Sequence, residues 1–426
     1  MRCGILKARS KYGIAVDIGT TNVTFNLINL IDGSVRNQYL MRNPQSQHGI
    51  DIITRMRFAI KSPENQEILV SLIRAGIKKA ILGLLKENGI DTSQVTDIVI
   101  VGNTVMHHLY FDLSLNSLMR PPYKATQKEF ILIAASEVGL DFIPNANCYS
   151  PPVVESFIGS DAIAVLIESK FLKSTEKKLV VDVGTNTEIS LLTPQGIWIA
   201  SAASGPAFEG WTIECGIGGE IGAIEAVSIN PATFEPTITI IGGGNPRGIC
   251  GTGAISAMAA LLESGLMLPR GSLNREIKSK WLSFDSNIAK YILAPGEQSS
   301  TSKDIVIAQT DLRKLQQSKA AIRAVMEMLL KQSNSSPNEI SEVYLTGVFG
   351  TGLKIEDAYR IGMFPRFQNA SITQVRNGAV RGAGLLLLEE NRKKVEPLMA
   401  QLNYIELTEE DEFRDLFVAS IPFPSK

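Results

Sequence analysis

The sequence YGIAVDIGTT at residues 12–21 has a counterpart, KLVVDVGTNTE, at residues 178–188, and this pair decides the fold. In each stretch, apolar and β-branched residues predict a strand that leads into an aspartate, Asp17 or Asp182, and then a glycine turn. A second apolar run follows each turn directly. Because the strand–turn–strand unit returns after about 165 residues, the sequence predicts a duplicated α/β fold with a cleft between its two copies.

The chemistry of both turns suits the phosphates of a nucleotide. Glycine lets the backbone approach a ligand closely, so peptide N–H groups can point at phosphate oxygens, and hydroxyl and amide side chains add donors. A carboxylate cannot favourably touch phosphate, so Asp17 and Asp182 require Mg²⁺ or a water in between. We therefore predict that the protein binds ATP and Mg²⁺, with both aspartates as catalytic and metal-linked residues. The residues expected to contact the phosphates are Gly19, Thr20, Thr21, Asn22, Gly184, Thr185 and Asn186.

The rest of the chain shows hydrophobic patterns typical of further helices and strands. We expect helices over residues 66–88, 313–331 and 378–389, and strands over residues 97–101 and 343–346. The expected domains are an N-terminal extension at 1–11, a first lobe at 12–175, a second lobe at 176–390, and a C-terminal tail at 391–426 packed on the second lobe. A lone DG-type turn is common in hairpins, but two copies at equivalent places in a repeated fold favour phosphate binding.

The composition of the 426-residue chain is that of an ordinary globular protein, with 44% hydrophobic and 20% charged residues. A formal net charge of −1 gives no general attraction to nucleic acid or to an anionic membrane. The sequence shows neither an apolar run of about 18 residues nor the apolar stretch of a secretory signal near MRCGILKARSKYG at its start. We therefore predict a cytoplasmic protein that binds neither nucleic acid nor membrane.

The four cysteines, Cys3, Cys148, Cys215 and Cys250, are too far apart in sequence to form a local CxxC pair. We expect them to be reduced and mostly buried thiols. The alternative is a metal or cluster site shared between the chains of a homodimer, for which Cys215 is the candidate.

The two turns resemble the phosphate loops of the superfamily of acetate and sugar kinases, heat-shock ATPases and actin. This resemblance implies duplicated ribonuclease H-like (actin-like ATPase) domains that hold ATP between them. The segment ESFIGSDA at residues 155–162 resembles the first connecting helix of that fold, and NGAVRGAG at 377–384 resembles the second. By the same resemblance, Glu155 at the helix start is a catalytic candidate that places the attacking water or the metal. The alternative is a charge that only favours the helix dipole.

The adenosine end of the nucleotide is predicted from glycine turns. The segment LTGVFG at residues 345–350 resembles the turn that admits adenosine, which makes Gly347 and Gly350 candidates. Gly243 and Gly244 lie in a further glycine turn. A simple tight loop is the alternative interpretation of either turn.

Several segments resemble one branch of the superfamily, the ATP-dependent reductive activators of corrinoid proteins. They include VGNTVMHHL at residues 101–109, GPAFEG at 205–210, GICGTG at 248–253, KAAIR at 319–323 and the ending from Phe417 to Pro424. The resemblance covers roughly residues 12–424. It implies that ATP binding and hydrolysis are coupled to the return of an inactive Co(II) corrinoid to Co(I), with a corrinoid protein as the partner.

Two pairs of polar side chains within these segments have both a functional and a structural interpretation. Lys319 and Arg323, one turn apart on a predicted helix, are candidates to flank the adenine, and a solvated helix face is the simpler explanation. His107 and His108 are expected just past a strand end, either near the cleft or a partner surface, or as a capping or core pair.

The sequence departs from the corrinoid activators in one respect. Those proteins usually carry an N-terminal ferredoxin-like domain with four cysteines around an iron–sulfur cluster, whereas here Cys3 alone precedes the first predicted strand. We therefore expect no iron–sulfur cluster in this chain and a separate protein as the electron donor. The alternatives are a small-molecule kinase, which needs a base beside an acceptor hydroxyl, and a scaffold that binds ATP without turnover.

Overall fold

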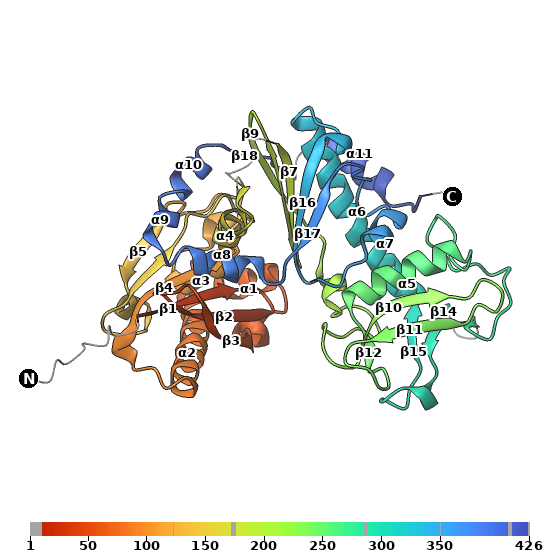
Figure 1. The fold of residues 1–426 in the computed structure, drawn as a ribbon, viewed down its shortest axis with the longest axis horizontal. Coiled ribbons are helices and arrows are strands. Elements are labelled where there is room, and N and C mark those ends of the chain that lie inside the picture. Colours follow the sequence, from red (N-terminus) through yellow and green to blue (C-terminus); the bar gives the residue numbers. More distant parts are fainter. Residues whose placement is uncertain are drawn as a thin grey trace, which may run out of the picture. The chain divides into compact units, whose positions relative to one another are not determined.

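The computed structural model describes residues 11–121, 123–171, 176–284, 288–349, 351–407 and 411–424. The chain divides into two compact units (Figure 1). Unit 1 comprises Met1–Ser174 and Asn377–Tyr404, and unit 2 comprises Thr175–Arg376 and Ile405–Lys426. Two six-stranded sheets provide the main framework.

The sheet of unit 1 has the strand order β3-β2-β1-β4-β6-β5. Its strands are β1 (Tyr12–Ile18), β2 (Asn22–Asn29), β3 (Val35–Arg42), β4 (Val95–Gly102), β5 (Ile131–Ala134) and β6 (Asn147–Ser150). β1 pairs antiparallel with β2 and parallel with β4, so the sheet is mixed. On one face, Ile14, Val16 and Ile18 of β1 enter the hydrophobic core, because alternate residues of a strand point to the same side.

Helices of unit 1 lie around this sheet, and several of them pack against its strands (Figure 1). They are α1 (Ile52–Ala59), α2 (Pro63–Glu87), α3 (Thr104–Phe111), α4 (Ser160–Glu168), α8 (Gly378–Leu385), α9 (Glu389–Arg392) and α10 (Val395–Met399). The sequence explains α2: Ser62 caps it by accepting a hydrogen bond from the N–H of Asn65, and Pro63 takes the first position, where no N–H is needed. Leu69, Ile73 and Ile77 then form a buried stripe at helical spacing.

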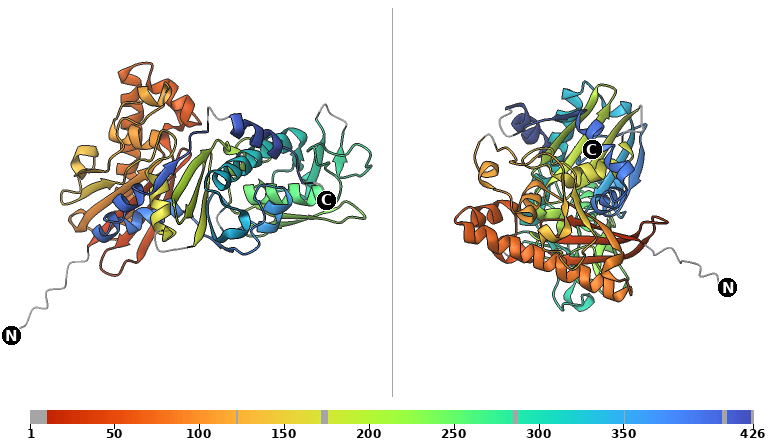
Figure 2. Two further views of the ribbon diagram at one scale, coloured as in Figure 1. Left: turned by 90° about the horizontal axis from the view of Figure 1, so that it is seen from above. Right: turned by 90° about the vertical axis from the view of Figure 1, so that its left-hand side faces the viewer.

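The main sheet of unit 2 has the order β17-β16-β7-β8-β9-β18. Its strands are β7 (Lys177–Val183), β8 (Thr187–Thr193), β9 (Gly196–Ala202), β16 (Ile340–Gly347), β17 (Ser371–Gln374) and the short β18 (Leu402–Tyr404), which ends just before the chain re-enters this unit at Ile405. The long helix α6 (Gln309–Gln332) packs against β8 and β9, and α11 (Asp411–Ser420) lies along α6 (Figure 2).

Two smaller sheets complete unit 2. One has the order β11-β10-β12 and the other β13-β14-β15. Their strands are β10 (Ala223–Ile229), β11 (Pro236–Ile240), β12 (Gly248–Ile249), β13 (Leu282–Ser283), β14 (Lys290–Ala294) and β15 (Ile305–Ala308). The apolar helix α5 (Gly251–Glu263) packs on β10, and α7 (Ile355–Arg360) packs on α5.

The two units repeat the same arrangement around their DxG turns. In unit 1 the turn joins β1 to the antiparallel β2, and Asp17 lies beside Val101 of the parallel β4. In unit 2 the turn joins β7 to the antiparallel β8, and Asp182 lies beside Thr346 of the parallel β16. The predicted duplicated α/β fold is therefore confirmed.

The compact units differ from the predicted domains at the C-terminal end of the chain. Residues 377–390 were expected in the second lobe, but α8 packs on α4 and β1 and belongs to unit 1. A Cβ built on Gly382 would lie 1.9 Å from the carbonyl oxygen of Ala164, so this helix crossing requires a residue without a side chain. The predicted tail is also divided, because residues 391–404 belong to unit 1 and only residues 405–426 to unit 2.

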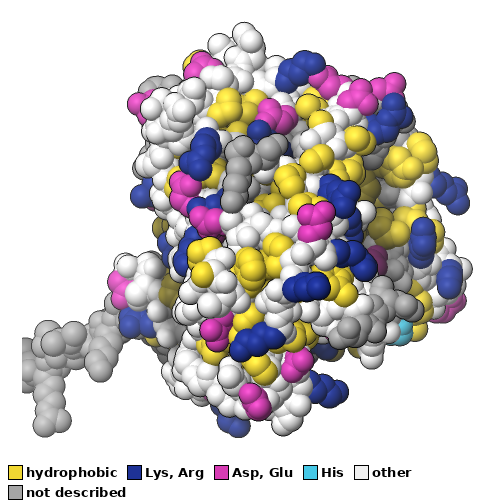
Figure 3. All heavy atoms as spheres, turned by 90° about the vertical axis from the view of Figure 1, so that its right-hand side faces the viewer, with side chains coloured by type: hydrophobic (Ala, Val, Ile, Leu, Met, Phe, Trp, Pro, Cys, Tyr) yellow, Lys and Arg dark blue, Asp and Glu magenta, His cyan; other side chains and the backbone are white. Residues whose placement is uncertain are grey.

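The surface carries both signs of charge. On the face drawn in Figure 3, Lys and Arg side chains lie interspersed with Asp and Glu side chains. Within the part of the chain that the structure describes, no helix combines the length and apolar character that a membrane span needs.

Candidate functional site

The first DxG turn lies at the carboxyl end of β1 and is partly accessible to solvent. Asp17, Gly19, Thr20 and Thr21 are half-buried, and Asn22, at the start of β2, is exposed. A Cβ on Gly19 would lie 2.6 Å from the carbonyl oxygen of Asn22, so glycine is what permits the tight reversal. The predicted phosphate-contacting residues of this half are therefore brought together on one accessible turn.

Three polar side chains from distant parts of unit 1 hold this turn. Nδ2 of Asn43 donates to the carbonyl oxygen of Gly19 at 2.9 Å. Nη2 of Arg55 donates to the carbonyl oxygen of Thr20 at 2.5 Å. Nδ2 of Asn103 donates to Oγ1 of Thr20 at 3.1 Å. These hydrogen bonds from other parts of unit 1 thus fix the conformation of the turn.

The second turn is braced by the segment Gly205–Gly210, which has the sequence GPAFEG. The N–H of Gly205 donates to the carbonyl oxygen of Thr185 at 2.8 Å. Oγ of Ser204 donates to the carbonyl oxygen of Gly184 at 3.1 Å. The hydroxyl of Thr185 donates to the carboxylate of Glu209. Within unit 2, this motif therefore contacts the predicted phosphate-binding turn directly.

Gly347 is also brought to the second turn, because β16 pairs with β7. It has a φ of +94°, and the N–H of the following residue, Val348, donates to the carbonyl oxygen of Val183 at 2.7 Å. Gly350, the other residue predicted from this segment, lies outside the described residues. Gly102 occupies the corresponding position in unit 1, beside Ile18 of β1.

Two further predictions concern Glu155 and a glycine turn of unit 2. Glu155 does not start the connecting helix, since α4 begins only at Ser160, and the Glu155 carboxylate pairs with Lys128. Gly243 and Gly244 lie in an exposed turn between β11 and β12, in a different sheet from β7. The carbonyl oxygen of Glu155 accepts a hydrogen bond from Oγ1 of Thr104 at 2.6 Å, and the neighbouring Asn103 is bonded to Thr20 of the first turn.

Lys319 is buried, and the solvated helix face expected for it is wrong. Its Nζ donates to the carbonyl oxygens of Ser420 at 2.6 Å and of Pro422 at 2.7 Å, and lies 4.8 Å from the centre of the Phe423 ring. Burial lowers the Lys319 pKa to about 7, with a smaller contribution from Arg323. The ammonium group is therefore occupied by the C-terminal segment of the chain itself.

Comparison with known proteins identifies the family. A model of the C-terminal domain of RACo, the ASKHA domain, matches residues 176–426, and a model of the RACo middle region matches residues 12–174. The chain belongs to the RACo family. The resemblance to corrinoid activators is thereby confirmed.

Individual relatives extend over nearly the whole chain. The corrinoid activation enzyme RamQ of Eubacterium limosum is 30% identical, over 98% of this chain and 71% of RamQ. A [Co(II) methylated amine-specific corrinoid protein] reductase of Methanosarcina barkeri is 29% identical, over 89% of this chain and 71% of its own length. A solved reductive activator for corrinoid, iron–sulfur protein has a TM-score of 0.89 at 30% identity, covering 98% of this chain and 67% of that chain.

In this RACo-family chain, His107 and His108 form a buried pair on α3. Nδ1 of His108 donates to the carbonyl oxygen of Thr104 at 2.8 Å, and the two Nδ1 atoms are 3.5 Å apart. Burial is the main cause that lowers the pKa of His107 to about 3 and of His108 to about 4, so both rings are neutral at physiological pH. Asn103, and neither histidine, is the N-cap of α3, and the burial of both rings is typical of a core pair.

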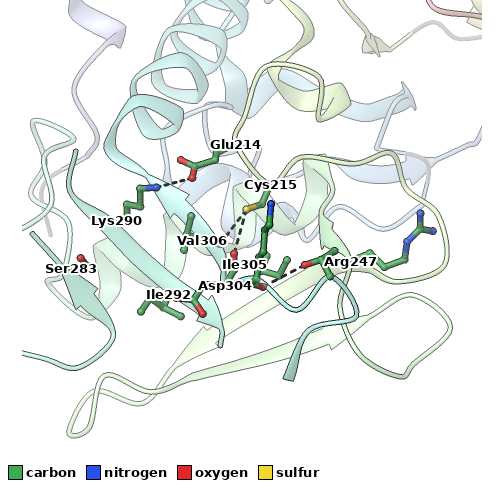
Figure 4. Close-up of a pocket in the computed structure, with 11 residues that line it drawn as sticks. Glu214, Cys215, Arg247, Ser283, Lys290, Ile292, Asp304, Ile305 and Val306 are labelled. Carbon is green, nitrogen blue, oxygen red and sulfur yellow. Dashed lines mark hydrogen bonds and ion pairs between the residues drawn. The ribbon is translucent and has the colours of Figure 1, made fainter. Parts of the chain in front are cut away.

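A cavity of about 650 Å³ lies in unit 2 between the loop at Cys215 and the sheet that contains β14 and β15 (Figure 4). Lys290 and Glu214 form an ion pair of 2.7 Å at its wall. Sγ of Cys215 accepts a hydrogen bond from the N–H of Val306 at 3.4 Å, and burial raises the pKa of this thiol. No predicted nucleotide-binding residue lines this cavity. The described residues contain no cluster of three or more His, Cys, Asp or Glu suited to a metal.

The residues that hold the two turns were missed by the sequence interpretation. Asn103 had a usable signal, because it follows a predicted strand in the segment GNT. Arg55 had a less obvious one: it shares the buried stripe of α1 with Ile52, Met56 and Ala59, where a charge is unexpected. Glu209 lies within the GPAFEG segment that carried the family resemblance, but Ser204 had no signal, since only the folded chain brings it to Thr185.

Proposed function

We propose that this chain is an ATP-dependent activator that returns the corrinoid of a partner protein from Co(II) to Co(I). Membership of the RACo family supports this role, as do the names of relatives that denote corrinoid activation and reduction. The partner is a corrinoid protein of methyl-group metabolism. By the name of the M. barkeri relative, a methylated-amine-specific corrinoid protein is the first to test.

The observation that carries the ATP part of this proposal is the duplicated turn. Each turn presents an aspartate, a glycine and hydroxyl or amide side chains at a strand end, and in each the carbonyl oxygens of the glycine and of the following threonine accept hydrogen bonds from within the unit. Oxygen ligands suit Mg²⁺, so Asp17 and Asp182 would hold the metal through water. Mg²⁺ would neutralise phosphate charge, while the hydroxyl and amide groups of the turns bind and orient the phosphates.

The electron must come from outside the ATP chemistry. Conversion of Co(II) to Co(I) consumes one electron, whereas hydrolysis of ATP with water to ADP and phosphate transfers none. We propose that a separate iron–sulfur protein supplies the electron, and that ATP favours one conformation of the activator over another, which makes the unfavourable transfer proceed.

A reconstitution experiment tests the proposal. The chain is mixed with a Co(II) methylated-amine-specific corrinoid protein, Mg²⁺ and a low-potential chemical reductant, and Co(I) is followed by visible absorption together with phosphate release. We expect Co(I) to accumulate only when ATP is present, and phosphate release to increase when the corrinoid protein is added. Absence of both the stimulation and a complex between the two proteins would contradict the proposal.

A further inference from the structure

Arg55 is a buried charged residue that bonds to the backbone of the first turn. Its side chain is fully buried on α1. Besides the carbonyl oxygen of Thr20, it donates to the carbonyl oxygen of Gly49 at 2.8 Å and, at 3.5 Å, to Oε1 of Gln45. In the described part of the chain no carboxylate forms an ion pair with it, and Asp51 contributes only a longer-range attraction.

The positive charge of Arg55 persists despite its burial. Desolvation lowers its pKa to about 10, which leaves the guanidinium protonated at neutral pH. A buried charge without a counter-charge is unfavourable, and an anion bound nearby would offset that cost. Because the surroundings are poorly polarisable, the attraction between Arg55 and such an anion would be screened less than at a surface.

The directions of the hydrogen bonds in the first turn indicate the side of the turn on which that anion would bind. In a planar trans peptide, the C=O and N–H groups point in opposite directions. Since the carbonyl oxygen of Gly19 accepts from Asn43 and that of Thr20 accepts from Arg55, the N–H groups of Thr20 and Thr21 are directed away from these donors. Arg55 thus fixes the orientation of the Thr20–Thr21 peptide group and places a positive charge on the carbonyl side of that group.

The second turn has the same peptide arrangement, but among the described residues no positively charged side chain donates to its carbonyl oxygens. The carbonyl oxygens of Gly184 and Thr185 accept from the hydroxyl of Ser204 and the N–H of Gly205, which are both neutral. The two halves of the duplicated fold therefore orient corresponding peptide groups by different means, and the first turn alone uses an arginine for this purpose.

We propose that Arg55 is a positioning residue for the phosphates of the nucleotide, which orients the Thr20–Thr21 peptide and supplies buried positive charge to the first turn. This inference rests on the proposed ATP binding. Because Arg55 is proposed to act on the phosphates and not on adenosine, the loss of affinity caused by Arg55 substitutions should increase with the number of phosphates on the ligand.

The test is a series of dissociation constants for adenosine, ADP and ATP, measured by calorimetry with Mg²⁺ on the full chain. Arg55→Gln keeps a donor but removes the charge, and Arg55→Lys keeps a charge but removes the planar fork. We expect Arg55→Gln to weaken ATP binding by roughly tenfold or more while leaving adenosine binding unchanged. Arg55→Lys should have an intermediate effect. The matched control is Arg57→Gln, which removes the same charge from an exposed position of α1 and should change nothing.

Each outcome decides a distinct question. If the wild-type chain binds neither ADP nor ATP, the proposed function fails. If the wild-type chain binds ATP and folded Arg55 variants bind it equally well, only the role of Arg55 is overturned. Equal weakening of adenosine and ATP would show a purely structural role and would also overturn it. If Arg55→Gln does not fold, the same comparison of adenosine with ATP is made on Arg55→Lys.

Discussion

Gly347 of β16 leaves no room for a side chain beside Asp182 of the parallel strand β7. A Cβ atom built on Gly347 would lie 2.7 Å from Oδ1 of Asp182 and 2.0 Å from the carbonyl oxygen of Val183. Gly102 has the corresponding relationship in unit 1, where a Cβ would lie 2.7 Å from the carbonyl oxygen of Ile18. In both units, a glycine at the end of the neighbouring strand thus makes room for the DxG turn.

The substitution Gly347→Ala should therefore disturb the second turn. It introduces a side chain where the backbone has a φ of +94° and where the Val183 carbonyl leaves no space. We expect the free energy of unfolding to fall by roughly 2 kcal/mol or more, and ATP binding to weaken because Asp182 is displaced. Urea denaturation and calorimetry measure the two effects. Gly83→Ala in α2, where a Cβ meets nothing within 4 Å, is the control and should stabilise the chain by about 0.5–1 kcal/mol. Equal stability of Gly347→Ala and wild type would contradict this prediction.

The substitution Asp182→Asn should separate ATP turnover from a role as a scaffold. If Asp182 holds Mg²⁺ through water, loss of its charge should slow ATP hydrolysis by roughly a hundredfold or more. Formation of Co(I) in the reconstituted system should fall in parallel. Asp141→Asn removes a carboxylate that pairs with Lys78 on the surface and serves as the control. Unchanged Co(I) formation by Asp182→Asn would favour a protein that binds ATP without needing turnover.

The sequence was informative where a local pattern determines the structure and uninformative where the fold joins distant residues. The strands that contain Asp17 and Asp182 next to their last residues were predictable, because each turn is specified by neighbouring residues. The contact of Arg55 with Thr20 joins residues on different elements, so no local pattern could predict it. Glu155 does not start the helix as expected: it forms a bridge with Ile158, α4 begins at Ser160, and helical pattern alone does not indicate such a bridge.

Lys319 should make stability depend on pH in the alkaline range. Its pKa is about 7 in the folded chain, below the ordinary lysine value of 10.5, so between these values the unfolded chain binds more protons. The free energy of unfolding should consequently receive a contribution that rises with pH across this window and is lost as the pH falls through about 7. Lys319→Met should flatten this rise, which urea denaturation between pH 6.5 and 10.5 would measure. Lys61→Met, at an exposed site, should leave the slope unchanged. An unaltered slope in Lys319→Met would show that its contacts with Ser420, Pro422 and Phe423 keep the pKa high.

The side chain of Asn103 bonds to α3 through one atom and to the first turn through another. Its Oδ1 accepts from the N–H of Met106 at 3.0 Å as the N-cap, while its Nδ2 donates to Oγ1 of Thr20 at 3.1 Å. Asn103→Asp retains an acceptor for the cap but loses the donor, so it should lose little stability. Asn103→Ala loses both and should cost about 1 kcal/mol of unfolding free energy.

The order of the two Asn103 variants in ATP affinity should be the reverse of their order in stability. Both release Thr20, but the new carboxylate of Asn103→Asp also repels phosphate, so ATP binding should be weaker in Asn103→Asp than in Asn103→Ala. Adenosine binding, measured by the same calorimetry, should be similar in the two. If the less stable variant, Asn103→Ala, binds ATP more tightly than Asn103→Asp, the difference in ATP affinity cannot be explained by stability alone. ATP affinities that simply follow the order of stability would contradict the proposed place of the first turn beside the phosphates.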